Sequence, residues 1–276
     1  MWRVFNKKKI TDTSEVAIHP DYGVFLRDRS WVPAPKYLLR RSRLLKILKD
    51  LKPGRVLEVG CGAGGITFDA TQMGFSCEAL ETSLQARNIA NKILSRARSP
   101  VEIHSSAAEW KEEFDVLMSF EVLEHIELDD AALKEWVSWV KPEGYLVLSV
   151  PALKSMWGPS DVWAGHYRRY EKDEFIALLN NNGLDCLHFE TYGYPLSYIT
   201  NFVRNIIYSR EVQKLSLGSQ QGTDRSGVER SKEAVFFGVQ ASMLGRAFMF
   251  FFCKVQTVFS KFGYGDGFII LAKKSD

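Results

Sequence analysis

Hydrophobic positions change their spacing several times along the chain, and the first regular stretch predicts a helix. Between residues 36 and 51, leucine and isoleucine recur every three or four positions among lysines and arginines. This spacing predicts an amphipathic helix with a basic face, which ends at Pro53 and Gly54. Residues 1–35 show no such period and contain three prolines, so we expect them to be irregular.

From residue 56 onward, short apolar runs alternate with segments of helical period. Strands are predicted at 56–59, 75–81, 101–104, 114–120, 145–150 and 184–190, and helices at 64–73, 83–98, 131–140 and 171–180. Alternation of this kind indicates βαβ units, in which helices join parallel strands and cover both faces of the sheet. We therefore expect an α/β fold with a doubly wound parallel sheet.

Beyond residue 193 the alternation stops. Residues 194–208 are apolar and helix-like, 212–232 are polar and typical of a mobile loop, and 263–273 have the pattern of one more strand. Residues 234–253 form an apolar segment interrupted by Gln240, Ser242 and Arg246. This segment could cross a bilayer as a helix, form a hairpin that lies on a membrane surface or binds lipid, or form a helix that packs within the protein or against a second subunit.

Composition and charge narrow the classes of function. The chain has 276 residues, of which 46% are hydrophobic, enough for one large or two small domains. Its four cysteines include no C-x-x-C pair, which argues against a disulfide scaffold or a structural zinc site and favours the cytoplasm. Residues 1–55 carry a net charge of +9, 56–194 of −11 and 195–276 of +5. This distribution does not suit a nucleic-acid-binding protein, whereas basic ends suit an anionic substrate or an anionic membrane surface.

A glycine-rich turn follows the first predicted strand, in the segment VLEVGCGAGG at 56–65. Such a turn brings backbone N–H groups at the start of a helix close to a ligand. Glu58, two residues before the first glycine, would repel a pyrophosphate but can compensate an ammonium group. Glu81 ends the next strand, at the spacing from the turn at which an acidic residue binds ribose hydroxyls.

These features resemble class I S-adenosylmethionine-dependent methyltransferases. The matching stretches are VLEVGCGAGG, ETS at 81–83, SSAAEW at 105–110, FDVLMSFEVLEHI at 114–126 and WVKPEGYLVLSVP at 139–151. The resemblance implies a Rossmann-like, seven-stranded sheet whose last strand, 263–273, is antiparallel, and S-adenosylmethionine as cofactor. It implies the following cofactor contacts: Gly60, Gly62 and Gly64 under the methionine part, Glu58 near its amino group, Glu81 on the ribose, Ser106 and Ala107 beside the adenine, and Phe120 and Glu121 at the sulfonium. Ser106 departs from the family, which often has Asp at that position.

Glu121, Glu124 and His125 share one face of a helical turn, which is a spacing that can bind a metal ion. Some quinone and small-RNA methyltransferases use a similar E-x-x-E-H for a divalent ion, and many relatives use none. We expect no metal here, and assign His125 as an orienting or proton-accepting residue.

A second cluster, DVWAGHYRRY at 161–170, follows the strand at 145–150. It resembles a subgroup of these methyltransferases that is common in bacterial cell-envelope and glycan biosynthesis. His166 is a candidate catalytic base, and Tyr167, Arg168 and Arg169 are candidate substrate-binding residues because arginine binds phosphate or carboxylate in a bidentate manner. The alternative is a loop-to-helix junction packed by its aromatic rings.

The expected organisation is an N-terminal lid (1–52), a cofactor-binding core (53–193), an apolar helical insertion (194–262) and the last strand of the core (263–276). We expect methyl transfer to O or N of an amphipathic or anionic acceptor: a lipid-linked glycan, quinone-like lipid or related metabolite. Expected partners are that substrate, a membrane surface and a second copy of the chain, with no nucleic acid, at the inner face of the membrane. The alternatives are a nicotinamide-dependent dehydrogenase or epimerase, which would need an apolar residue at position 58, and a non-catalytic cofactor-binding subunit of a membrane complex.

Overall fold

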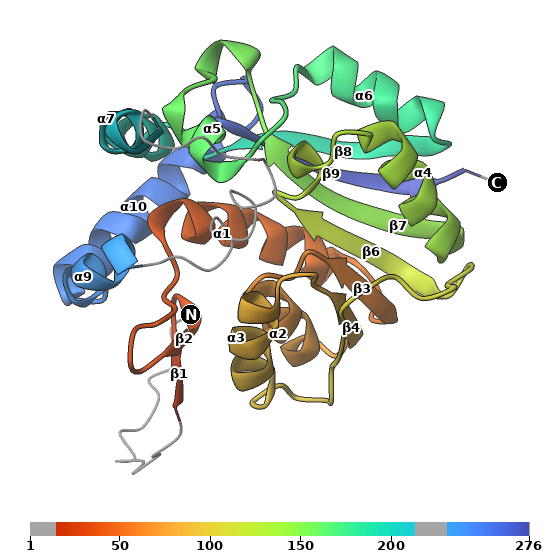
Figure 1. Ribbon diagram of the computed structural model, residues 1–276, viewed down its shortest axis with the longest axis horizontal. Coiled ribbons are helices and arrows are strands. Elements are labelled where there is room, and N and C mark those ends of the chain that lie inside the picture. The colour runs from red at the N-terminus through yellow and green to blue at the C-terminus, as the bar shows by residue number, and fades with distance from the viewer. Residues whose placement is uncertain (1–14, 213–230, 276) are drawn as a thin grey trace.

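The computed structural model describes residues 15–212 and 231–275, and a mixed sheet lies at its centre (Figure 1). In order across the sheet, the seven strands are β5 (Glu102–His104), β4 (Ser76–Leu80), β3 (Arg55–Val59), β6 (Phe114–Phe120), β7 (Val140–Pro151), β9 (Gly267–Lys274) and β8 (Leu184–Tyr192). The first five strands pair in parallel, and β9 is antiparallel to both β7 and β8. The expected seven-stranded sheet with an antiparallel last strand is therefore confirmed.

Helices cover both faces of this sheet (Figure 1). The helices are α1 (Pro35–Asp50), α2 (Gly65–Gln72), α3 (Leu84–Leu94), α4 (Asp129–Trp139), α5 (Pro159–Ala164), α6 (Lys172–Asn181), α7 (Leu196–Val212), α9 (Ser231–Gln240) and α10 (Met243–Phe259), with short 3₁₀ turns at η1 (Leu123–His125) and η2 (Lys154–Met156). Alternate strand residues face opposite layers: Val116 packs with α1 and α2, whereas Leu117 packs with α4 and α6. Burial on both faces explains why the central strands are apolar without alternation.

Helix α1 confirms the helix expected at 36–51 and packs closely on the sheet. Its buried face consists of Leu38, Leu39, Arg43, Leu44, Ile47 and Leu48. The guanidinium of Arg43 donates two hydrogen bonds to the carboxylate of Glu190 on β8, at 2.9 and 2.5 Å. This part of the expected N-terminal lid is thus a layer of the core, and the boundary at residue 52 stays a prediction.

Residues 15–26, expected to be irregular, form an antiparallel hairpin instead. Strand β1 (Val16–His19) pairs with β2 (Gly23–Leu26). The expectation was wrong because each strand has only four residues, too few for a period to be seen. The hairpin packs beside α2 and α3.

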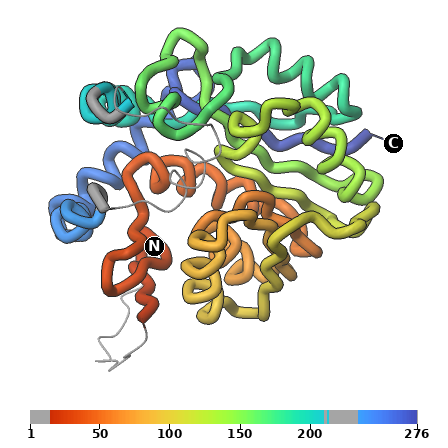
Figure 2. Tube along the Cα trace, viewed as in Figure 1, coloured from red at the N-terminus to blue at the C-terminus, as the bar shows by residue number. Residues whose placement is uncertain are grey.

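The apolar segment at 234–253 belongs to two helices, α9 and α10, whose axes differ by 89°. Ser242 begins α10, because its side chain accepts a hydrogen bond from the N–H of Gly245 at 3.2 Å. A Cβ at Gly245 would lie 2.2 Å from the carbonyl oxygen of Val239, so only glycine permits this close approach. The C-terminal helix α10 lies beside the N-terminal α1 (Figure 2). Most of the expected loop at 212–232 lies outside the described residues.

Candidate active site

One cavity of about 910 Å³ lies at the carboxyl ends of β3, β4 and β6, between α1 and α7. Many of the residues singled out in the sequence line it: Glu58, Gly60, Gly62, Glu81, Ala107, Phe120, Glu121, His125, His166 and Arg169. Gly64, Ser106, Tyr167 and Arg168 do not. Ligands of doubly wound sheets bind at this edge of the strands, so the cavity is the candidate active site.

The glycine turn forms one wall of the cavity. Gly60, Gly62 and Gly64 all have positive φ values, and Gly64 is the N-cap of α2. A Cβ at Gly60 would lie 2.4 Å from Cγ2 of Val122, so a larger residue would displace the neighbouring loop. The N–H of Gly62 donates to the carboxylate of Glu81 at 2.8 Å, and Ser83 N–H donates to its other oxygen at 2.9 Å. The turn and the end of β4 are therefore held together by Glu81 itself.

Glu58 lies buried at the end of β3 and accepts a hydrogen bond from the hydroxyl of Thr67. Burial raises the pKa of Glu58 to about 8, because a carboxylate loses its hydration there. An ammonium group bound nearby would restore the charged form of the carboxylate. A glycine-rich turn, a buried acid beside it and a carboxylate that follows β4 form a donor set that fits S-adenosylmethionine.

Glu121 lies at the opposite wall with a strained backbone, since its φ is +60°. Its carboxylate accepts a hydrogen bond from the Tyr192 hydroxyl at 3.0 Å and lies 3.6 Å from Nζ of Lys36 and 3.7 Å from Nη1 of Arg40. Burial alone would raise the pKa of Glu121, but the charges of Lys36 and Arg40 lower it to about 2. The carboxylate is therefore ionised at neutral pH.

Lys36, Arg40 and Tyr192 were missed in the sequence. Lys36 and Arg40 are one turn apart on α1. The sequence indicated the basic face of that helix, but it did not indicate that the two residues lie beside Glu121. Lys36 also lies 3.2 Å from Asp266, which precedes β9. The folded chain thus brings α1, β6 and β9 to the same wall.

His166 is oriented by a carboxylate, as a catalytic base requires. Its Nδ1 lies 2.9 Å from Oδ1 of Asp161, which also accepts a hydrogen bond from Nε of Arg169 at 2.9 Å. Burial raises the pKa of Asp161, but the hydrogen bond to His166 and the charge of Arg169 outweigh it and bring it to about 2. Because Asp161 is ionised, it favours the tautomer of His166 with the proton on Nδ1 and the lone pair on Nε2.

The neighbouring arginines have structural partners. Arg169 is buried and also donates to the carbonyl of Ala152 at 3.0 Å, so it positions Asp161. Arg168 lies outside the cavity, paired with Asp129 at 2.5 Å and with the carbonyl of Glu127. Tyr167 is half-exposed outside the cavity as well. These positions do not support the expected substrate contacts of Tyr167 and Arg168.

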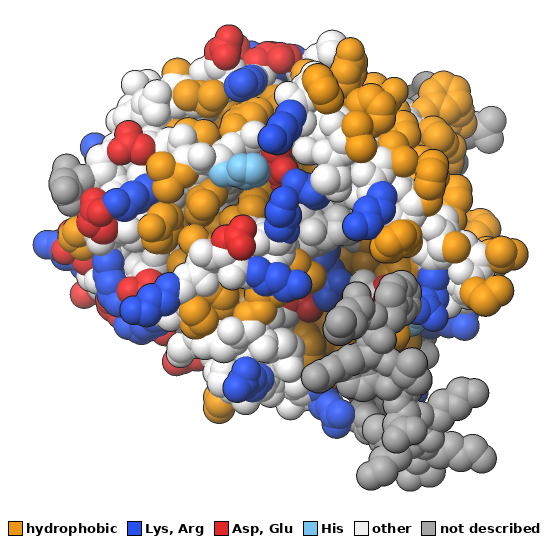
Figure 3. All heavy atoms as spheres, turned by 180° about the vertical axis from the view of Figure 1, so that it is seen from behind, with side chains coloured by type: hydrophobic (Ala, Val, Ile, Leu, Met, Phe, Trp, Pro, Cys, Tyr) orange, Lys and Arg blue, Asp and Glu red, His pale blue; other side chains and the backbone are white. Residues whose placement is uncertain are grey.

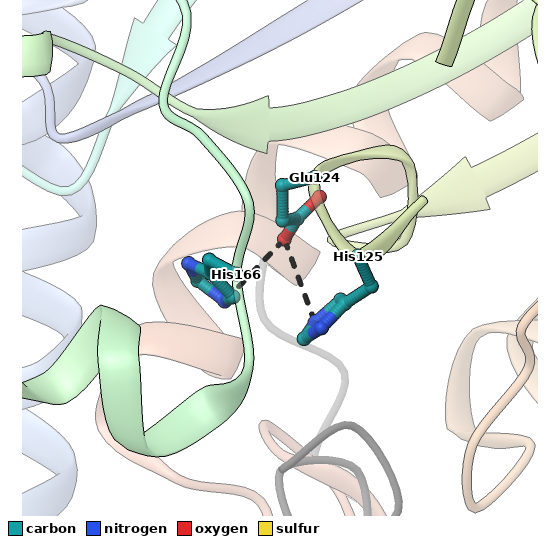
Figure 4. A group of neighbouring side chains, drawn as sticks. All are labelled: Glu124, His125 and His166. Atoms are coloured by element: carbon teal, nitrogen blue, oxygen red, sulfur yellow. Dashed lines mark ion pairs between the residues drawn. The ribbon is translucent and has the colours of Figure 1, made fainter. Parts of the chain in front are cut away.

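Glu124, His125 and His166 lie close together at the cavity, which the two histidines line while Glu124 is buried behind them (Figure 4). Oε1 of Glu124 lies 4.0 Å from Nε2 of His125 and 3.9 Å from Nε2 of His166, and neither oxygen has a hydrogen-bond partner among the described residues. Burial lowers the pKa of His125 to about 3. Burial and the charge of Glu121 raise the pKa of Glu124 well above its usual value. The three donor atoms of this group lie close enough together to hold a metal ion.

The comparison with protein families decides the identity of this architecture. A family model described as "Methyltransferase domain" matches residues 30–189, more than half of the chain. The chain belongs to the class I S-adenosylmethionine-dependent methyltransferases. Within this methyltransferase, the match covers α1, the strands from β3 to β7, the glycine turn and most of β8, and it ends before α7, α9, α10 and β9.

The names of individual relatives of the methyltransferase refer to different methyl acceptors. The chain is 30% identical over 155 residues to phosphoethanolamine N-methyltransferase of Triticum aestivum (54% of this chain, 28% of the relative). It is 26% identical over 135 residues to the ubiquinone biosynthesis O-methyltransferase of Rhodopseudomonas palustris (48% of this chain, 51% of the relative). The chain thus spans about a quarter to a half of the length of these curated relatives.

A solved structure shows the same fold. Phosphoethanolamine N-methyltransferase 2 of Haemonchus contortus, in complex with S-adenosyl-L-methionine, aligns with a TM-score of 0.52 at 16% identity, covering 86% of this chain and 53% of that one. S-adenosylmethionine is therefore the expected cofactor.

Proposed function

We propose that the protein transfers the methyl group of S-adenosylmethionine to an oxygen or nitrogen of an amphipathic, anionic acceptor. The observation that carries the proposal is the continuity of one cavity from Glu58, Glu81 and the glycine turn to His166. The expected cofactor groups and a histidine oriented by Asp161 thus share one space. Such an arrangement suits methyl transfer, in which alignment of the two reactants supplies most of the rate enhancement.

The bound cofactor would supply an electrophilic methyl group on its sulfonium. On the protein side, Nε2 of His166 accepts the proton that the attacking hydroxyl or amine loses, since Nδ1 faces Asp161. Arg169 holds Asp161 in place through its own hydrogen bond.

The acceptor end of the cavity supports an amphipathic substrate. Ile199 and Val203 of α7 and Phe236 of α9 give it an apolar wall. Arg204 lies in the same wall and forms no ion pair with any described carboxylate, so it can bind an anionic group of the acceptor. The names of the relatives, with one N- and one O-acceptor, are compatible with both kinds of attacked atom.

Transfer of a labelled methyl group tests the proposal. Protein is incubated with methyl-labelled S-adenosylmethionine and either membrane-lipid or water-soluble extract, with His166→Ala as the matched inactive variant. We expect label in the lipid fraction with the wild-type protein only. Binding of the cofactor is checked separately by thermal shift, where a hundredfold excess over Kd stabilises by about 2.7 kcal/mol. Stabilisation by NAD but not by S-adenosylmethionine would overturn the proposal, and so would label that appears equally with His166→Ala.

A further inference from the structure

Helix α7 exposes an apolar stripe between Ile199 and Ile207. Its exposed side chains are Ile199, Phe202, Val203, Ile206 and Ile207, and Phe202 is 68% exposed. Their spacing of three and four residues places them on one face of the helix. Helices of globular proteins bury such a face, so this one lacks its partner in the described part of the chain.

Helices α9 and α10 continue the apolar surface. Their exposed side chains are Val235, Phe236, Val239, Met243, Leu244, Phe248, Phe250, Phe251 and Val258, followed by Phe262. Figure 3 shows hydrophobic side chains gathered at one edge of the molecule, the edge at which Figure 1 places α7, α9 and α10. A contiguous apolar surface of this kind marks an interaction site. We call it the apolar edge.

The charges of residues 234–265, which include α10 and most of α9, have one sign. Residues 234–265 contain Arg246, Lys254 and Lys261 but no Asp or Glu. Arg246 is paired with Asp21, whereas Lys254 and Lys261 are exposed and form no ion pair in the described part of the chain. A two-fold dimer through residues 234–265 would place these lysines in an interface to which neither copy of that segment contributes a carboxylate. An anionic lipid surface would compensate them instead.

The apolar edge is also continuous with the active-site cavity. Ile199, Val203 and Phe236 belong both to the exposed surface and to the cavity lining. None of the described helices is by itself long and apolar enough to cross a bilayer, and only α9 and α10 taken together meet that criterion, with their 89° bend. Short helices with apolar outer faces and basic residues lie in the plane of the membrane interface.

We infer that the apolar edge, formed by α7, α9 and α10, docks the protein on an anionic lipid bilayer. Phenylalanine and isoleucine side chains insert among the acyl chains, and Lys254 and Lys261 lie at the level of the headgroups. In this orientation the apolar wall of the cavity faces the bilayer. This docking does not depend on the methyl acceptor, so it can be tested without measuring turnover.

Vesicle flotation of the full chain tests the inference. Phosphatidylglycerol-containing and pure phosphatidylcholine vesicles are compared at low and high salt. We expect binding to the anionic vesicles at low salt, and partial release by salt because screening weakens the lysine contribution but not the apolar one. The double variant Phe202→Ser/Phe251→Ser is expected to reduce the partition coefficient at least tenfold. Lys254→Gln/Lys261→Gln is expected to reduce binding to anionic vesicles and leave binding to neutral vesicles unchanged.

Leu187→Ser is the matched control, because Leu187 is exposed on β8, outside the apolar edge. It should bind vesicles like the wild type, and thermal shift with S-adenosylmethionine shows that each variant is folded. The inference is overturned if the wild-type protein remains unbound with every vesicle. It is also overturned if light scattering shows a dimer that Phe202→Ser/Phe251→Ser dissociates, since the apolar edge would then be a subunit interface.

Discussion

Nδ1 of His166 and Oδ1 of Asp161 lie 2.9 Å apart, and this contact determines how the imidazole can act. The four residues between them include the C-terminal turn of α5 and Gly165, whose positive φ ends that helix. The aspartate is at the start of the short helix and the histidine directly after its end. One helical turn therefore builds the pair, and Nε2 of His166 is left facing Glu124.

Replacing His166 tests its role as proton acceptor. His166→Ala is expected to lower kcat by about 10²–10⁴-fold, the usual contribution of a general base, while the affinity for S-adenosylmethionine stays near that of the wild type. Asp161→Asn is expected to lower kcat as well, because the wrong tautomer of His166 is favoured. His188→Ala, on the surface of β8 and outside the cavity, is the control. A His166→Ala protein with wild-type kcat would exclude this histidine as the base.

The carboxylate of Glu81 is expected to accept hydrogen bonds from the ribose hydroxyls of the cofactor. Glu81→Ala should weaken S-adenosylmethionine binding by about 1.5–3 kcal/mol, the range for hydrogen bonds to a charged group. Loss of the bond from Gly62 N–H also loosens the turn, which acts in the same direction. Isothermal titration measures the affinity, with Glu102→Ala on the exposed edge strand β5 as control. An affinity within twofold of the wild type would show that the ribose lies elsewhere.

Spacing in the sequence predicted the core of the fold well and its edges poorly. The strand expected at 114–120 is β6 to the residue, because a buried run between two turns is a strong local signal. The position of the bend between α9 and α10 was not predicted, because it depends on a single N-cap, Ser242, within a largely apolar run. The hairpin of β1 and β2 was missed because its strands are very short.

The residues of the site also differ in how far the sequence could predict them. Glu58, Glu81 and the glycines lie at strand ends, where local pattern determines position, and the structure brings them to one cavity. The ion pairs of Glu121 with Lys36 and Arg40 join segments far apart in the chain, so no spacing could reveal them. Arg168 was predicted to bind the substrate because of its residue type, but its guanidinium forms an ion pair with Asp129 in the folded chain.

Glu58 makes the stability of the ligand-free protein depend on pH. Its pKa in the folded protein is about 8, above the value of 4.5 for an ordinary glutamate. As the pH rises, the folded protein therefore keeps this proton after the unfolded chain has lost it. The contribution of the proton to the free energy of unfolding is complete below about pH 4.5 and is lost as the pH rises through about 8. Glu58→Gln removes the titration, so the variant should gain about 2–4 kcal/mol relative to the wild type between pH 5 and pH 8.5. Urea unfolding at several pH values measures it. Equal pH dependence of the two proteins would show that Glu58 does not titrate in this range.

Chelation tests whether Glu124, His125 and His166 hold a metal ion. We expect protein dialysed against EDTA to keep its methyl-transfer rate and its melting temperature, and added Mg²⁺, Mn²⁺ or Zn²⁺ to leave both unchanged. The reason is electrostatic: Glu121 is already compensated by Lys36 and Arg40, so Glu124 is the one carboxyl left to balance a divalent charge. Burial and the charge of Glu121 also raise the pKa of Glu124 well above its usual value, and a protonated acid is a poor ligand.

The control for this experiment addresses the other group that could bind a cation in the described part of the chain, formed by Glu78, Glu102 and His104. His104→Ala removes that group, which lies outside the cavity. A chelator effect on the melting temperature that disappears in His104→Ala would be assigned to this surface group and would leave the prediction intact. Loss of activity that persists in His104→Ala and is restored by one of the added ions would contradict it. Glu124, His125 and His166 would then be metal ligands, and Nε2 of His166 would bind the metal instead of a proton.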